Sequence, residues 1–228
     1  MRYDTLLFDA DDTVFDFQSS AEKCFLATCK EFGFADEQSD YSVYKVINQK
    51  FWDDYSAGKI KKSDIILKRF EVYAERYGIT LDTEKFAKSY ENKLAHTCIL
   101  LPNAETALKE LKAAGARLYM ITNGVTFVQN TRLDLSGLRP LFSGVFISDE
   151  IGYAKPSKEY FSFVEKAVSD FDKKKTLIIG DSVVSDVALG VNNGVDVCLM
   201  NFHGENADEN VGYKYEIKEL TEIKEIIK

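Results

Sequence analysis

Histidine and cysteine are scarce in this chain of 228 residues, and their placement excludes the commonest metal and redox sites. The two histidines, His96 and His203, are too few and too isolated to build a histidine-based metal site. The four cysteines form no Cys-x-x-Cys pair and have no histidine at metal-ligand spacing. Cys29, Cys98 and Cys198 lie in apolar surroundings, so we expect them to be buried free thiols.

Long apolar runs and an excess of basic residues are also missing. No stretch is long enough to span a membrane, and Asp4 interrupts the N-terminal region, so we expect no secretory signal and a cytoplasmic protein. Acidic residues outnumber basic ones by 37 to 29, which argues against nucleic acid or a membrane surface as a partner. A small anionic substrate remains compatible, because a local metal ion and one lysine override the global field.

What the sequence does contain is a dense acidic cluster near its start. Asp9, Asp11 and Asp12 follow directly after the apolar run Leu6–Phe8. This pattern predicts a buried strand that delivers carboxylates to its C-terminal end, where open α/β sheets bind ligands. Three carboxylates in four positions repel one another, so the cluster favours a divalent cation such as Mg²⁺. A plain surface turn is the competing interpretation, since aspartate is common in turns.

The rest of the chain shows two kinds of sequence pattern. Residues 17–97 carry four amphipathic helical patterns, the first opening on a predicted capping box at Ser19–Glu22, and they are interpreted as a four-helix-bundle cap. Residues 98–228 alternate Val/Ile/Leu-rich strands with helices, with a loop predicted at 148–156 and an acidic loop at 203–212. Together with residues 1–16 they predict a doubly wound, mostly parallel, Rossmann-like α/β core.

Residues with phosphate chemistry lie just past the predicted strands. In a parallel sheet these strand ends share one edge. Thr122 offers a hydroxyl, the Gly124 region offers backbone N–H groups at a helix start, and Lys155 offers a positive charge. Taken one at a time, each residue also has a purely structural interpretation: part of a turn, a solvated lysine, or an acid in the first turn of a helix. The whole set is Asp9, Asp11, Thr122, Asn123, Gly124, Lys155, Asp181 and Asp186.

The order and spacing of these residues resemble those of the haloacid dehalogenase-like (HAD) superfamily. The matching motifs are Asp9-x-Asp11-x-Thr13, the strand-end Thr122, Lys155-Pro156 and Gly180-Asp181-x-x-x-x-Asp186. The resemblance covers essentially the whole chain, including the helical insert. Segments Phe8–Thr13, Phe51–Gly58, Ile121–Gly124 and Gly152–Pro156 are similar to the pyrimidine-type 5′-nucleotidase branch, which acts on nucleoside monophosphates.

The resemblance implies a magnesium-dependent phosphomonoester hydrolase with a small phosphate ester as its substrate. Asp9 would be the nucleophile that forms an aspartyl-phosphate, and Asp11 the acid and base. Lys155, Thr122, Asn123 and Gly124 would bind the phosphoryl group. Asp9, the Asp11 carbonyl, Asp181 and Asp186 would hold the metal, with Asp186 acting through water or by orienting Lys155.

Several alternatives stay open at this stage. A phosphatase of another small ester or a sugar phosphomutase would share these residues. A hydrolytic dehalogenase of the superfamily would not need Asp11 or a metal site. A phospho-accepting signalling domain uses similar groups, but it is shorter and lacks a helical insert. Trp52, beside Phe51, is a candidate for stacking on a nucleobase, with packing inside the helical bundle as the alternative.

Overall fold

The computed structural model of the protein describes residues 1–204 and 211–228, and it divides the chain into two compact units. Unit 1 comprises Met1–Phe17 and Cys98–Lys228, and unit 2 comprises Gln18–Thr97. The acidic loop predicted at 203–212 falls mainly on 205–210, which lie outside the described residues.

Unit 1 is built on a parallel sheet. Within the described residues the sheet has six strands in the order β3-β2-β1-β4-β5-β6, and each neighbouring pair is parallel. The strands are β1 (Thr5–Phe8), β2 (Arg117–Thr122), β3 (Gly144–Ile147), β4 (Thr176–Gly180), β5 (Asp196–Met200) and β6 (Tyr215–Ile217). The predicted α/β fold class is therefore confirmed. β1, which carries the acidic cluster, lies between β2 and β4.

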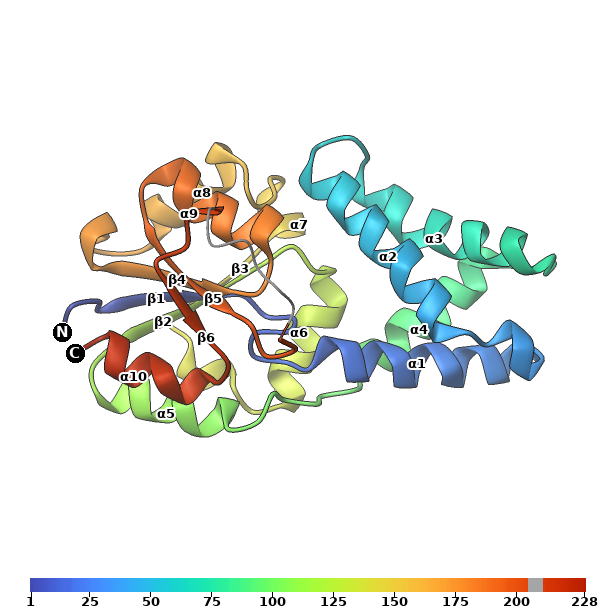
Figure 1. Cartoon of the computed structure of the whole chain (residues 1–228), viewed down its shortest axis with the longest axis horizontal. Coiled ribbons are helices and arrows are strands. Elements are labelled where there is room, and N and C mark those ends of the chain that lie inside the picture. Colours follow the sequence, from blue (N-terminus) through green and yellow to red (C-terminus); the bar gives the residue numbers. More distant parts are fainter. Residues whose placement is uncertain (205–210) are drawn as a thin grey trace. The chain divides into compact units, whose positions relative to one another are not determined.

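Helices cover both faces of this sheet (Figure 1). Leu6 and Phe8 pack with α5 (Ala104–Ala113) and α10 (Ile223–Ile226) on one face, as the alternation of side chains along a strand requires. Leu7 packs with α8 (Lys158–Ala167) and α9 (Ala188–Asn193) on the other face. Figure 1 shows α5 and α10 on one side of the sheet and α8 and α9 on the other. The helices are α5 (Ala104–Ala113), α6 (Thr126–Leu135), α7 (Ser148–Ile151), α8 (Lys158–Ala167), α9 (Ala188–Asn193) and α10 (Ile223–Ile226).

Two local predictions were wrong. The segment 148–156 is not all loop, because Ser148–Ile151 forms the short helix α7. The capping box at Ser19–Glu22 does not start a helix either, since α1 already begins at Phe17. The backbone of Asp12 lies in the left-handed region at φ 53°. Its side chain accepts a hydrogen bond from the Phe17 backbone N–H at 2.9 Å. Asp12 thus satisfies a helix-start donor that the sequence pattern assigned to serine.

Unit 2 consists of helices packed around aromatic rings. Phe25 stacks on Tyr44 with ring centroids 4.3 Å apart, and Tyr44 stacks in turn on Phe70 at 5.4 Å. Phe86 packs edge-on against Phe70 at 5.0 Å, which ties the last helix to the others. The helices are α1 (Phe17–Glu31), α2 (Tyr41–Ser56), α3 (Lys62–Tyr77) and α4 (Thr83–Ala95).

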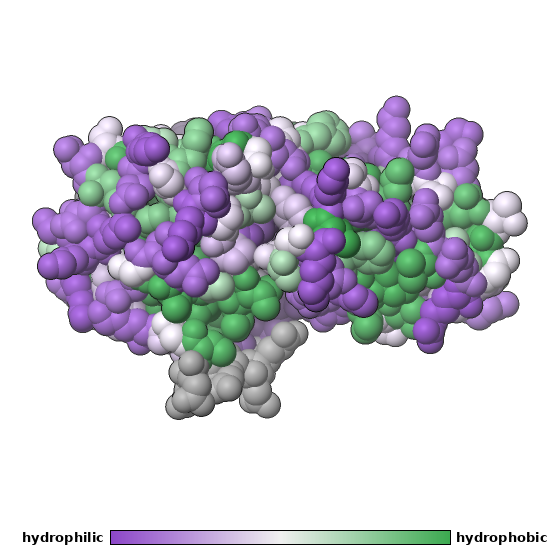
Figure 2. Space-filling view, turned by 90° about the horizontal axis from the view of Figure 1, so that it is seen from above, coloured by the Kyte–Doolittle hydropathy of each residue, from purple (hydrophilic) through white to green (hydrophobic). Residues whose placement is uncertain are grey.

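The surface mixes polar and apolar residues, and the face in Figure 2 shows hydrophilic residues interspersed with smaller hydrophobic areas. Among the described residues, no helix is both long and apolar enough to cross a membrane. The cysteines are free: Cys24, Cys29 and Cys198 are buried, whereas Cys98 is only half-buried, so the expectation of a buried thiol was wrong for Cys98.

Candidate active site

The acidic cluster lies at the C-terminal end of β1. Phe8 is in register with Met120 of β2 and Ile179 of β4, so Asp9 follows the strand between the two neighbouring strand ends. The Asp9 backbone N–H donates to the Ile179 carbonyl at 2.8 Å, which continues the pairing one residue past the strand. The strand order therefore brings residues that are more than 100 positions apart in the sequence to one edge of the sheet.

Lys155 is the cation at the centre of this edge. Its Nζ lies 2.5 Å from Asp9 Oδ1 and 2.7 Å from Asp186 Oδ1, and it donates to the Ile121 carbonyl at 3.1 Å. Only 1% of the lysine side chain is exposed. Burial alone would lower the pKa of Lys155, but the Asp186 and Asp9 carboxylates outweigh it and hold that pKa above its usual value.

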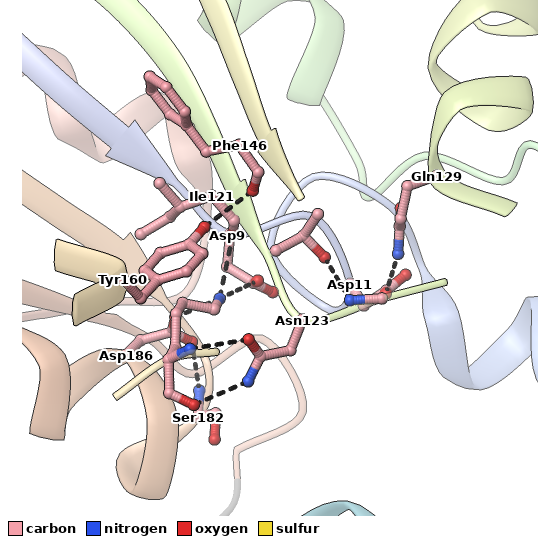
Figure 3. Close-up of polar contacts among 12 residues, drawn as sticks. Asp9, Asp11, Ile121, Asn123, Gln129, Phe146, Tyr160, Ser182 and Asp186 are labelled. Atoms are coloured by element: carbon pink, nitrogen blue, oxygen red, sulfur yellow. Dashed lines mark hydrogen bonds and ion pairs between the residues drawn. The ribbon is translucent and has the colours of Figure 1, made fainter. Parts of the chain in front are cut away.

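Asn123 fixes the backbone of Lys155. Its side-chain amide donates to the Lys155 carbonyl at 2.9 Å, and its amide oxygen accepts from the Lys155 N–H, also at 2.9 Å. Figure 3 shows Asn123 turned toward this part of the site. The predicted substrate-binding residue thus has both ends of its amide engaged with the segment that presents the lysine.

Asp186 is completely buried behind the strand ends. Its second oxygen, Oδ2, accepts from the Ser182 backbone N–H at 3.2 Å, in the loop between β4 and the π-helical turn η4 (Val183–Val187). A Cβ on Gly180 would lie only 2.3 Å from Asp186 Cγ, so glycine at the end of β4 makes room for the carboxylate.

Three of the carboxylates have the geometry of a metal site. Asp9, Asp181 and Asp186 each offer an oxygen, and these oxygens lie within 4.8 Å of one another. An all-oxygen donor set suits a hard cation such as Mg²⁺. Burial is the main cause that raises the pKa of Asp9 from 3.8 to about 7, with Lys155 opposing the shift and Asp186 and Asp11 adding to it. Burial and the carboxylates of Asp9 and Asp186 raise the pKa of Asp181 as well. These residues fit a divalent cation, which would relieve the repulsion among them.

Asp11 has a separate set of partners on α6. Gln129 Nε2 donates to its Oδ2 at 2.6 Å, and Arg132 Nη1 donates to its Oδ1 at 2.5 Å. The sequence motifs did not predict a role for Gln129 or Arg132. The available signal was their spacing of three residues, which places two polar side chains on one face of the helix that follows Gly124.

The remaining predicted residues fall in two places. Thr122 ends β2, is 1% exposed, and accepts the Gly124 backbone N–H on its hydroxyl oxygen at 3.0 Å. Trp52 is on α2 in unit 2, where its ring meets Tyr55 edge-on at 6.0 Å and Lys62 Nζ lies 6.0 Å from its centroid. The buried residues of α2 are Tyr44 and Asn48, so Trp52 is not part of the bundle core.

The site combines a strand-end aspartate, a second aspartate two residues later, a buried lysine and a pair of acids that fit a metal ion. This combination defines one known type of hydrolase site. A family model for haloacid dehalogenase-like hydrolases matches residues 3–194. The chain belongs to this family, and the resemblance predicted from the sequence motifs is confirmed.

Relatives with full-length similarity come from several bacteria. YfnB of Bacillus subtilis, named as a HAD-hydrolase, is 34% identical over 99% of this chain and 96% of its own length. The pyrimidine 5′-nucleotidase YjjG of Escherichia coli is 31% identical over 100% of this chain and 99% of its own length. The pyrimidine 5′-nucleotidase PynA of Streptococcus pneumoniae is 35% identical over 89% of this chain and 86% of its own length. The predicted likeness to the 5′-nucleotidase branch is thereby confirmed.

Solved structures agree with this placement. A crystal structure of YfnB from Bacillus subtilis bound to magnesium has a TM-score of 0.92 at 33% identity, covering 100% of this chain and 99% of that one. An L-2-haloacid dehalogenase from Xanthobacter autotrophicus has a TM-score of 0.75 at 16% identity, with coverage of 99% and 98%. The second likeness concerns the fold alone.

Proposed function

We propose that this protein is a magnesium-dependent phosphomonoester hydrolase that works through an aspartyl-phosphate on Asp9, with nucleoside 5′-monophosphates as its substrates. The observation that carries the proposal is the contact between Asp9 and Lys155 at 2.5 Å, beside the metal-fitting carboxylates of Asp181 and Asp186. A nucleophilic carboxylate and an anionic phosphate repel each other, so a phosphatase needs cations at this point.

The proposed reaction has two steps. In the first, an Asp9 oxygen bonds to phosphorus while the bond from phosphorus to the ester oxygen breaks, and Asp11 gives its proton to the departing alkoxide. In the second, Asp11 takes a proton from water as the water oxygen bonds to phosphorus and the bond to Asp9 breaks. The products are an alcohol and inorganic phosphate, and both carboxyl groups return to their initial states.

The neighbouring groups hold the phosphoryl oxygens. Lys155 supplies a point charge, and Thr122 and Gly124 supply a hydroxyl and a backbone N–H at the start of the α6 segment. Asn123 supports this set through the backbone of Lys155, to which both ends of its amide are bonded. Displacing the lysine by even about 1 Å would cost much of the rate, since phosphoryl transfer depends on positioning.

The metal would be held by Asp9, Asp181 and Asp186 together with the Asp11 carbonyl. A bound Mg²⁺ would neutralise charge on the carboxylate and phosphate oxygens, which lowers the repulsion between nucleophile and substrate. The all-carboxylate character of the cluster and the raised pKa values of Asp9 and Asp181 support this assignment.

Nucleotides are proposed as substrates because YjjG and PynA are named as pyrimidine 5′-nucleotidases. Trp52 is the proposed base-binding residue, because it is half-buried and lies outside the bundle core. If Trp52 stacks on the base, Trp52→Ala lowers kcat/KM for a nucleotide more than for p-nitrophenyl phosphate. Equal losses on both substrates would remove Trp52 from the site.

The proposal is tested by a phosphatase screen of the purified chain with and without Mg²⁺, over nucleotides, sugar phosphates and small phosphates. We expect release of inorganic phosphate that needs Mg²⁺ and is strongest with nucleoside 5′-monophosphates. Asp9→Asn should abolish turnover, and retained activity in that variant would overturn the mechanism. Transfer of phosphate between two positions of a sugar would indicate a phosphomutase. A long-lived phosphoaspartate without turnover would indicate a phospho-accepting domain.

A further inference from the structure

The carboxylate of Asp11 is held at both oxygens by one helix. Gln129 contacts Oδ2 at 2.6 Å and Arg132 contacts Oδ1 at 2.5 Å. The two donors are three residues apart on α6, so they project from the same face. Figure 3 shows the Gln129 amide pointing at Asp11 from this helix. Two donors on two oxygens define the plane of the carboxylate as well as its position.

Both donors are buried, whereas their acceptor is not. Gln129 is 2% exposed and Arg132 is 0% exposed, but 27% of the Asp11 side chain is exposed. The guanidinium of Arg132 also lies over the ring of Phe15, 4.3 Å from its centroid. Burying an arginine is costly unless a carboxylate and an aromatic face compensate it. The arrangement therefore supports Asp11 from the protein side and leaves its remaining lone pairs accessible.

The backbone of a neighbouring motif makes room for this contact. A Cβ at Gly124 would lie 2.0 Å from Gln129 Nε2 and 2.7 Å from Gln129 Cδ. Real Cβ atoms do not approach other heavy atoms so closely, so any other residue at 124 would push the glutamine away. Gly124 thus has a second use beyond its backbone N–H, which is to leave space for the Gln129 side chain.

We propose that Gln129 and Arg132 are positioning residues that orient Asp11 for proton transfer to and from the reacting oxygens. The inference rests on the proposed phosphatase function. Asp11 has to place a proton on the departing alkoxide and later remove one from water, so its carboxyl group must return to one orientation in each cycle. Each carboxylate oxygen has two lone pairs, and the hydrogen bond from α6 occupies one of them. The other remains for the transferred proton.

Positioning of a proton donor has a kinetic signature that general structural support lacks. An alkyl ester such as a nucleoside 5′-monophosphate releases a poor leaving group that needs the proton. An aryl ester such as p-nitrophenyl phosphate releases a stable phenolate that does not. Since kcat/KM reports the steps up to formation of the aspartyl-phosphate, loss of Asp11 alignment should lower kcat/KM for the alkyl ester selectively.

The experiment compares kcat/KM for these two substrates in Gln129→Ala, Arg132→Lys and Gly124→Ala, with Asp11→Asn as the reference. We expect each variant to lose at least about tenfold more on the alkyl ester than on the aryl ester, a part of the 10²–10⁴-fold that a general acid contributes. Inhibition by inorganic phosphate should stay within about twofold in Gln129→Ala, because the phosphoryl-binding groups are intact. If Arg132→Lys does not fold, the other two variants carry the test.

Matched controls come from the same helix region. Asn130→Ala removes an amide that binds Glu150 at 3.0 Å, and Arg139→Lys alters an arginine that pairs with Asp134; neither touches Asp11. Both controls should keep the wild-type ratio between the two substrates. Equal losses on the two esters in Gln129→Ala and Gly124→Ala would overturn the positioning role. A wild-type chain that hydrolyses neither ester, or an Asp11→Asn variant with unchanged selectivity, would instead overturn the proposed function.

Discussion

Lys155 Nζ lies 2.7 Å from Asp186 Oδ1, and each of the two side chains is only 1% exposed. The same Nζ contacts Asp9 Oδ1 at 2.5 Å, so one buried cation serves two carboxylates. A buried ion pair is costly to break from one side, because the remaining charge has neither water nor a partner. The stability of unit 1 and the geometry of the candidate active site therefore depend on the same buried ion pairs.

Lys155→Met is expected to destabilise the protein by about 3–5 kcal/mol, the usual cost of leaving buried charge unpaired. Urea unfolding monitored by circular dichroism measures this change. Lys174→Met is the matched control, because Lys174 is exposed and its loss should cost less than about 0.5 kcal/mol. Adding Asp186→Asn to Lys155→Met should recover part of the loss, since it removes one of the stranded charges. A double variant less stable than Lys155→Met would contradict this account.

Asp9→Asn is expected to stabilise the metal-free protein at alkaline pH. Burial raises the pKa of Asp9 from 3.8 to about 7, so the folded state binds a proton more tightly than the unfolded state. The stability from that proton is present below pH 3.8 and is lost as the pH rises through about 7. Asparagine cannot ionise, so at pH 8 the variant should exceed the wild type by up to about 4 kcal/mol.

The measurement is a thermal unfolding curve of both proteins in the presence of EDTA, at pH 4 and at pH 8. The two Tm values should converge at the lower pH, where Asp9 is mostly protonated in the wild type. A variant with a lower Tm than the wild type at pH 8 would show that the ionised Asp9 is stabilised by Lys155 more than burial penalises it.

Addition of Mg²⁺ should raise the Tm of the wild type if, as we propose, Asp9, Asp181 and Asp186 hold the cation, because only the folded chain brings their oxygens within 4.8 Å of one another. The increase should be larger at pH 8 than at pH 5.5, since protons compete with the metal for carboxylates of raised pKa. Asp181→Asn should lose most of the increase, and Asp53→Asn, at an exposed site in unit 2, should keep it. An equal Mg²⁺ effect in both variants would place the cation elsewhere.

Gly180→Ala is expected to disturb Asp186, because the new Cβ would lie 2.3 Å from its Cγ. Overpacking of this kind costs about 1–3 kcal/mol, and the displaced carboxylate would also release Lys155, so activity should fall together with stability. Gly144→Ala is the milder comparison, since its Cβ would lie 3.2 Å from the Tyr119 ring and 3.6 Å from the Phe146 ring, neither of which is a predicted catalytic group. Denaturation midpoints and phosphatase rates of the two variants test the difference.

Asn123→Ala removes both hydrogen bonds that hold the Lys155 backbone, each 2.9 Å long. The lysine would then be less well placed, and we expect kcat/KM to fall by about 10–100-fold. Asn193→Ala, which removes a single amide bond to the Leu189 carbonyl, should leave kcat/KM near the wild-type value. A similar loss in both variants would indicate a general effect on folding.

Much of the fold and of the candidate site was predictable because the signals are local. Leu6–Phe8 and Leu177–Ile179 are buried apolar runs, and the acids one or two residues after them had to lie at strand ends. Once parallel strands were inferred, Asp9 and Asp181 had to share one edge of the sheet. The motif order then led to the correct family.

The partners of Asp11 were not predictable in the same way. Gln129 and Arg132 stand on a helix whose apolar pattern says nothing about which polar groups turn inward, and their importance depends on a residue 118 positions away from Gln129. The predicted start of α1 was wrong for a related reason. Asp12 reaches Phe17 across a turn in an uncommon backbone conformation, whereas a capping box is recognised only by adjacent spacing.

The sequence by itself largely determined where strands and helices occur, which acids follow the strands, and which family these motifs indicate, because apolar periodicity and motif spacing are properties of neighbouring residues. Only the tertiary structure decided which charges meet. The strand order β2-β1-β4 brings Lys155 between Asp9 and Asp186, and α6 turns Arg132 onto Asp11. Those contacts depend on distances between elements remote in the chain, which only packing of the whole sheet and its helices sets.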